Sequence, residues 1–337
     1  MNPLKSYNYF KYLRFESVPT PVVIVVVATM LLNSEQAAAM GKKPSPSQTQ
    51  PNYMIAALGD SIAAGTLADT SVHIDQESET DIQNNYASTV KAKFIYTNRY
   101  TLAWGTGNKI ESHYMQLKSW LAKNEPEMNL VPLNVAIPGA VAADLVGEAQ
   151  SVVTAMATGQ YRALKYVTID IGANDACAVT SSTPDGTPDD KFADNLRKVF
   201  ATLAQIKQDQ PIRVIVSSIP KVPDLGRPDI QETKTLGGVA CSWIRQHIFT
   251  YCRTLPVWSS VDQYEHDVAV VEDKNAILQS VIDEVNRTTP NIQASFSYAV
   301  YDEPIDADLL ALDCFHPNKD GQSMMATKLW ADQPWFH

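Results

Sequence analysis

Cysteine is scarce, with four residues in a chain of 337. No two of them form a CxxC pair, and no Cys/His cluster has metal-ligand spacing, so the sequence gives no indication of a structural zinc site. Four cysteines are also few for a disulfide-dense scaffold, whereas the 45% of apolar residues can build a core. We expect a globular protein with no metal and no other cofactor.

Basic residues are outnumbered, since 27 Lys and Arg stand against 37 Asp and Glu, and the formal net charge is −10. Proteins that bind nucleic acid neutralise phosphates with clustered Lys and Arg. The acidic balance disfavours such a surface, and it also disfavours tight electrostatic docking on an anionic membrane. We therefore expect no nucleic-acid partner, at most transient contact with a lipid surface, and a monomer.

Long apolar runs are limited to residues 22–32, VVIVVVATMLL, near the N-terminus. Lys5, Lys11 and Arg14 precede this run and three alanines ending at Ala39 follow it, which is the order of a secretory signal peptide. The run is shorter than the roughly 20 residues of a membrane-spanning helix, so a retained anchor is the weaker interpretation. We expect cleavage near Ala39 and export, either secreted or periplasmic.

The remaining chain divides into a linker and one domain. Residues 40–52 include KKPSPSQTQPN, which is rich in Pro, Ser and Gln and indicates a flexible linker. Residues 53–337 contain no repeat and no second change of composition, so we expect a single domain there.

Short apolar runs alternate with amphipathic stretches throughout that domain. The strand candidates are 54–58, 133–136, 166–171, 213–219 and 295–301, and the helix candidates are 141–156, 190–208, 263–287 and 319–330. Strands separated by helices indicate right-handed βαβ units, and so an α/β fold: a three-layer α/β/α sandwich with a central parallel sheet. Residues 66–128 form a long connection, with a helix expected around residues 86–92.

A serine and a histidine follow strand ends in this pattern. Ser61 lies in Gly59-Asp60-Ser61-Ile62 after the first strand, on a tight turn that we expect to open a helix. Asp313 and His316 lie in one loop, so the carboxylate can reach one imidazole nitrogen while the other faces a serine. Each of these two motifs is common by itself, and most of its occurrences in proteins are ordinary turns or surface loops.

Two further positions supply hydrogen-bond donors. Gly139 follows the second strand and its N–H is open to close approach; Asn174, in GAND after the third strand, carries a side-chain amide. Acyl transfer needs such donors where negative charge develops on oxygen. Separately, Gly139 suits an ordinary turn and Asn174 a helix cap. Asp60 and Asp175, beside these motifs, are expected to brace their turns.

Taken together, Ser61, Gly139, Asn174 and His316 resemble the residue blocks of the SGNH, or GDSL-type, hydrolase superfamily, over roughly residues 55–330. Asp313 matches the family's acid three residues before the histidine, and GDSI stands where the family has GDSL. The phrases IGANDAC and DCFHP are most similar to the phospholipase B-like and extracellular lipase branch. The resemblance implies a flavodoxin-like SGNH hydrolase fold and a Ser61–His316–Asp313 triad, with an oxyanion hole from Ser61, Gly139 and Asn174.

The function expected from this resemblance is hydrolysis of small-molecule or lipid carboxylic esters through an acyl-enzyme. A carbohydrate O-acetylesterase or a thioesterase on the same site remains open, and so does a non-catalytic secreted binding protein. An α/β-hydrolase elbow is disfavoured because GDSIA lacks the final glycine of GxSxG and follows the first strand of the domain. A metal-dependent phosphoesterase would need clustered Asp and His ligands.

An exported chain favours paired cysteines, and three pairings are possible. Cys177 lies near Asn174 and Cys314 near His316, and both of those residues must reach Ser61. The pairing favoured on that ground is Cys177–Cys314, which leaves Cys241–Cys252.

Overall fold

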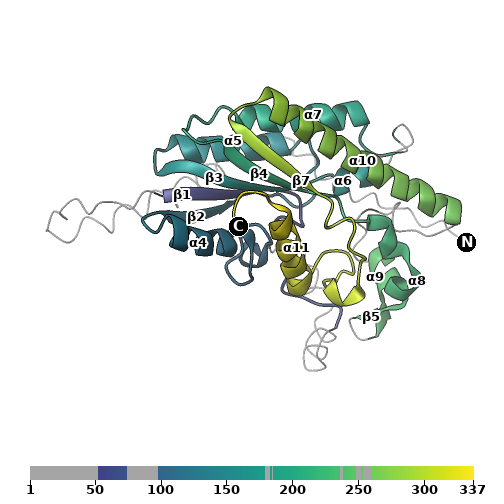
Figure 1. Cartoon of the computed structure of the whole chain (residues 1–337). Coiled ribbons are helices and arrows are strands. Elements are labelled where there is room, and N and C mark those ends of the chain that lie inside the picture. The colour runs from purple at the N-terminus through teal and green to yellow at the C-terminus, as the bar shows by residue number, and fades with distance from the viewer. Residues whose placement is uncertain are drawn as a thin grey trace, which may run out of the picture. The chain divides into compact units, whose positions relative to one another are not determined.

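Five parallel strands form the central sheet of the protein, which a computed structural model describes for residues 52–73, 98–178, 183, 185–235, 238–247, 252 and 260–337. The order across the sheet is β2-β1-β3-β4-β7 (Figure 1). Their bounds are β1 Asn52–Gly59, β2 Asn129–Asn134, β3 Tyr161–Asp170, β4 Ile212–Ser217 and β7 Ile292–Ser297. All neighbouring pairs are parallel. Their carboxyl ends therefore lie at one edge of the sheet.

Helices cover both faces of the sheet. The helices α5, α7 and α10 pack with one another over one face, and α4 and α11 contribute to a separate core on the other (Figure 1). Their bounds are α4 His113–Asn124, α5 Leu145–Ala157, α7 Asp189–Leu203, α10 Val261–Thr288 and α11 Lys319–Asp332. The expected three-layer α/β/α sandwich is confirmed.

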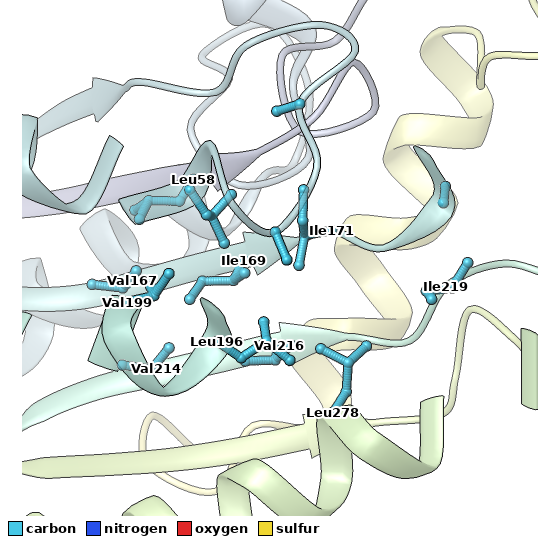
Figure 2. Packing of buried hydrophobic residues seen from close by; sticks show 14 of the residues in the cluster. Leu58, Val167, Ile169, Ile171, Leu196, Val199, Val214, Val216, Ile219 and Leu278 are labelled. Carbon is cyan, nitrogen blue, oxygen red and sulfur yellow. The ribbon is translucent and has the colours of Figure 1, made fainter. Parts of the chain in front are cut away.

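The side chains of β1 point alternately to the two faces of the sheet, which explains why the sheet has a core on each side. Met54, Ala56 and Leu58 belong to the core beneath α5 and α7, whereas Tyr53 and Ile55 belong to the core beneath α4 and α11. Successive strand residues point to opposite faces, so a strand covered twice is apolar throughout. Figure 2 shows the first core, where residues of β1, β3 and β4 meet those of α7 and α10.

Several smaller elements lie in the connections between the strands and the larger helices. They are the 3₁₀ helices η4 Tyr100–Leu102, η5 Val222–Gly226 and η6 Ala307–Leu309, the helices α6 Ala173–Cys177, α8 Pro228–Glu232 and α9 Cys241–His247, and a two-stranded antiparallel sheet of β5 Lys234–Thr235 and β6 Val239–Ala240. The segment from η5 to α9 is a connection between β4 and α10. It is an addition to the alternating strand and helix pattern.

The expected strands and helices agree with those observed to within a few residues at most ends. Five ends differ by four or five residues: β2 and β3 begin earlier than expected, at Asn129 and Tyr161, α5 begins later, at Leu145, and α7 and β7 end earlier, at Leu203 and Ser297. The described residues belong to one compact unit, Gln50–His337. The expected signal peptide of residues 1–39, nearly all of the linker of residues 40–52 and the helix around residues 86–92 lie outside the described residues.

The cysteine pairing favoured from the sequence is wrong. The disulfides are Cys177–Cys252 and Cys241–Cys314. The segments of Cys177 and Cys314 are each bonded to the connection that contains α8 and α9, and not to each other. Cys241 begins α9 and is fully buried against Cys314, so the packing of this connection decides the pairing.

Candidate active site

The turn after β1 carries Ser61. Gly59 has φ 141°, and a Cβ there would lie 2.0 Å from the carbonyl oxygen of Asp170, so only glycine fits without strain. The Asp60 N–H donates to that same carbonyl at 3.1 Å, which fixes the next residue of the turn against β3. Ser61 is 8% exposed. The sheet therefore holds the serine at its carboxyl edge with its surroundings largely closed.

Residues 61–65 form hydrogen-bonded turns and not the helix that we expected to begin there. The N–H of Thr66 donates to the carbonyl of Ser61 at 2.9 Å. Gly65 then takes φ 65°, and Thr66 forms an isolated antiparallel bridge with Asn98. A left-handed residue and a bridge are incompatible with a continuing helix, so the chain turns away at once.

The loop before α11 brings a base and an acid to Ser61. Nε2 of His316 lies 2.7 Å from Oγ of Ser61, and Nδ1 lies 2.5 Å from Oδ2 of Asp313. The other oxygen of Asp313 accepts the backbone N–H groups of Phe315 and His316, at 3.1 and 3.0 Å. Asp313 is fully buried and His316 is 3% exposed. With the Nδ1–H tautomer, Nε2 is left to accept the hydroxyl proton.

The two oxyanion-hole candidates outside the serine turn are neighbours in space. Nδ2 of Asn174 donates to the carbonyl of Ala140 at 3.0 Å, which places this amide beside the loop of Gly139. Nδ2 also lies 3.3 Å from Oδ2 of Asp60, next to the serine. Gly139 has φ 84°, with open space where a Cβ would be. The structure thus gathers all five candidates at one edge of the sheet.

A family profile matches this chain over residues 55–329, a range that includes every residue of this cluster. Its description is GDSL-like Lipase/Acylhydrolase. The chain belongs to the GDSL lipase/acylhydrolase family. It is therefore an ester-hydrolysing serine hydrolase. No curated protein matches the sequence at a significant level.

Solved structures resemble this GDSL hydrolase at low identity. TesA is 12% identical with a TM-score of 0.43, covering 83% of this chain and 97% of TesA. The acetylxylan esterase Axe2 from Geobacillus stearothermophilus is 14% identical with a TM-score of 0.44, covering 84% and 94%. The psychrotrophic esterase EstA from Pseudoalteromonas sp. is 13% identical with a TM-score of 0.40, covering 83% and 95%.

Asp60 braces the serine turn of this GDSL hydrolase, as expected from the sequence. Its Oδ1 accepts the N–H of Ile62 at 2.9 Å, while Oδ2 faces the amide of Asn174. Burial raises the pKa of Asp60 to about 6, and the nearby imidazole of His316 and the N–H of Ile62 oppose that rise. Asp175 connects two loops instead of bracing only its own turn, because its Oδ2 accepts the N–H of Ala142, in the loop that follows Gly139, at 2.9 Å.

Glu148 is a buried carboxyl group that the sequence argument did not assign. Its Oε2 accepts the N–H of Gly59 at 2.8 Å, and burial raises its pKa to about 8. A signal for it was present, because Glu148 lies on the apolar stripe of α5 with Leu145, Ala149 and Val152. A glutamate in such a stripe needs a polar partner. Here the partner is the backbone N–H of Gly59, two residues before Ser61.

The described part of the chain contains no group of three or more His, Cys, Asp or Glu side chains that could hold a metal ion. His316 contacts Asp313 through Nδ1 and Ser61 through Nε2. The other histidine with a buried ring is His113, which bonds Tyr166 and the carbonyl of Ala326 within the core beneath α4 and α11.

Proposed function

We propose that this protein is an exported serine esterase that cleaves carboxylic esters through an acyl-enzyme on Ser61. The observation that carries the proposal is the unbroken hydrogen-bond chain from Oγ of Ser61 through His316 to Asp313. Its members come from opposite ends of the domain and meet at the carboxyl edge of the sheet, where ligands of open α/β folds bind.

The first half of the reaction forms the acyl-enzyme. His316 takes the hydroxyl proton of Ser61 on Nε2 as Oγ attacks the ester carbonyl, and Asp313 stabilises the imidazolium. The tetrahedral intermediate then collapses, the C–O bond to the alcohol breaks, and His316 gives its proton to the departing alkoxide. Water attacks the acyl-enzyme in the second half, with His316 again as base, and releases the acid and free Ser61.

The negative charge on the carbonyl oxygen is stabilised by three donors. They are the backbone N–H groups of Ser61 and Gly139 and the side-chain amide of Asn174. Nδ2 of Asn174 is already oriented between the two loops by Ala140 and Asp60. Substrate binding exchanges one of these acceptors for the ester oxygen.

Small-molecule or lipid esters of carboxylic acids are the proposed substrates. The phospholipase B-like and extracellular lipase branch remains a proposal based on IGANDAC and DCFHP. Thioesters and acetylated glycans are cleaved by the same acyl-transfer chemistry, so they are tested beside the carboxylic esters as alternative substrates.

Export through the signal peptide of residues 1–39, with residues 40–52 as linker and the hydrolase domain from residue 53, is part of the proposal. Two disulfides support it, because oxidising compartments maintain such bonds. None of the helices in the described ranges combines the length and apolar character of a membrane span.

Purified protein treated with a fluorophosphonate probe tests the nucleophile. The wild type is expected to be labelled and to hydrolyse p-nitrophenyl esters, and Ser61→Ala to abolish labelling and lower kcat by about 10⁴-fold or more. Ser151→Ala, at an exposed position of α5, is the matched control and keeps both. Full ester hydrolysis by Ser61→Ala would refute the assignment, and a wild type that neither labels nor turns over would favour a binding protein.

A further inference from the structure

A cavity of about 70 Å³ lies beyond the carboxyl ends of β3, β4 and β7. Its wall combines η5 after β4, the connection that follows β7 and contains η6, and one side of α11. Leu225, Leu309 and Met324 represent these three parts of the wall. The cavity belongs to the same edge of the sheet as the proposed triad.

The wall of this cavity is continuous in sequence with the reacting residues. Ile62 follows Ser61, Ala173 precedes Asn174, and Phe315 and Pro317 flank His316; all four line the cavity. The Phe315 ring also packs edge-on against the imidazole of His316, with ring centroids 5.1 Å apart. An ester carbonyl held at the serine therefore has one apolar space beside it.

The chemistry of the wall selects an apolar group. Apart from Glu303 and Asp306, the wall consists of apolar side chains and one glycine. Glu303 is paired with Lys328 at 2.5 Å, and the carboxylate of Asp306 accepts the N–H of Asp308 at 3.0 Å. Both charged groups are acidic, so a phosphate or carboxylate substituent would be repelled, and a sugar would find few partners for its hydroxyl groups.

The acyl part of an ester suits this cavity better than the alcohol part. The alcohol leaves after the first step, and water must then reach the carbonyl from the side that the alcohol vacates. Apolar cavities hold water poorly, so this space is unsuited to that path. The acyl chain stays bonded to Ser61 until the second step and gains from a dry surrounding.

The size of the cavity sets a length. A cavity of about 150 Å³ accommodates the six carbons of benzene, so about 70 Å³ accommodates roughly three carbons. We propose that this cavity is the acyl pocket and that it selects short chains of about three carbons beyond the carbonyl, as in a butyryl ester. The inference rests on the esterase function proposed above.

Two ester series separate acyl from alcohol selection. In p-nitrophenyl esters the leaving group is constant, and we expect kcat/KM to rise about 16-fold from acetyl to butyryl, at about fourfold per buried methylene, with no gain beyond butyryl. In acetate esters of ethanol, butanol and octanol the acyl group is constant, and kcat/KM is expected to vary less than threefold. A steep alcohol series with a flat acyl series would overturn the assignment.

Variants of the wall test the cavity itself. Leu309→Phe narrows it and is expected to bring the butyryl-to-acetyl ratio of kcat/KM close to one, whereas Met324→Ala deepens it and moves the optimum to hexanoyl or longer. Met115→Ala is the matched control, because Met115 on α4 is also half-buried beside the same core as Met324 and is absent from the cavity wall. It keeps the wild-type profile.

Each variant is first checked for folding by its thermal transition and its fluorophosphonate labelling rate. An unchanged butyryl-to-acetyl ratio in folded Leu309→Phe, or an unchanged optimum in Met324→Ala, would overturn the acyl pocket. Ester hydrolysis that Ser61→Ala leaves intact would instead be a failure of the proposed function, so the two failures are distinguishable.

Discussion

The two halves of the candidate site are held in place by different physical means. On the nucleophile side, β1 and two hydrogen bonds fix the Ser61 turn: the N–H of Gly59 donates to the carboxyl group of Glu148, and the N–H of Asp60 donates to the backbone carbonyl of Asp170. On the base side, the loop from Asp313 to His316 lies outside the sheet and is covalently bonded to α9 through Cys314. The first half depends on hydrogen bonds alone, whereas the second adds a disulfide to the hydrogen bonds of Asp313.

This difference predicts which conditions disturb each half. The carboxyl groups under the serine have raised pKa values, because burial disfavours their charge. Their hydrogen bonds therefore respond to pH. The disulfide of the base side responds to reduction. Variants that act on one half alone separate the two effects.

The largest effect is expected from the donor that spans both loops of the nucleophile side. Asn174→Ala should lower kcat by about 10²–10³-fold with little change in KM, because the amide acts on charge that develops in the transition state. Steady-state kinetics on p-nitrophenyl butyrate measure this. Asn124→Ala, at an exposed position of α4, should leave kcat unchanged. A higher KM with an unchanged kcat would instead assign Asn174 to substrate binding.

An intermediate effect is expected on the base side. The two disulfides join residues 73 and 75 positions apart, so removing either should cost a similar free energy of unfolding, about 4 kcal/mol. Their effects on activity should differ. Cys241→Ser with Cys314→Ser should lower kcat about tenfold in folded protein, whereas Cys177→Ser with Cys252→Ser should lower it less than threefold. Kinetics and urea unfolding of both double variants measure these quantities.

The strained backbone of Cys314 allows a rescue experiment for the predicted loss of kcat. Cys314 has φ 57°, a left-handed conformation that costs a non-glycine residue about 1 kcal/mol or more. Combining Cys241→Ser with Cys314→Gly removes that strain without restoring the bond, so part of kcat should return. Equal losses in both disulfide variants, with no rescue by glycine, would mean that the bond acts on stability alone.

The smallest effect concerns stability and pH on the nucleophile side. The pKa of Glu148 is about 8 in the folded protein and 4.5 for an ordinary glutamate, so the folded state holds the proton more tightly. Stability should therefore fall as pH rises from about 4.5 to 8, by on the order of 1–3 kcal/mol. Glu148→Gln, which resembles the protonated acid, should flatten that slope in urea unfolding at several pH values.

Glu125→Gln is the control, because the pKa of Glu125 is lowered in the folded protein whereas that of Glu148 is raised. The amine of Lys165 and the hydroxyl of Tyr53 lower the pKa of Glu125, although partial burial opposes them, so its contribution is lost only as pH falls below the ordinary range. This variant should leave the slope between pH 5 and 8 unchanged. An identical slope in wild type and Glu148→Gln would remove Glu148 from the pH response.

Much of this architecture was predictable because local pattern and tertiary role agree. The apolar run of β1 is buried on both faces, and α7 has a strong apolar stripe, so periodicity alone placed them. Ser61 and Asn174 follow the ends of β1 and β3 within four residues, and His316 lies three residues before α11. Parallel strands bring their carboxyl ends to one edge, which is why three separated motifs could be assigned to one site.

What was not predictable depends on contacts between distant segments. The cysteine pairing follows from the packing of α9 against the Cys314 loop, which no periodicity encodes. The turn after Ser61 fails to continue as a helix because Gly65 takes a left-handed conformation beside Arg99. Glu148 acquires its partner only when α5 lies beneath the end of β1.

The two disulfides also interleave along the chain. Cys241 lies within the loop closed by Cys177 and Cys252, and Cys252 lies within the loop closed by Cys241 and Cys314. Any single peptide bond broken between Cys177 and Cys314 therefore leaves two pieces that are still joined by at least one disulfide. A protease that nicks this region cannot separate the polypeptide that carries Ser61 from the one that carries His316.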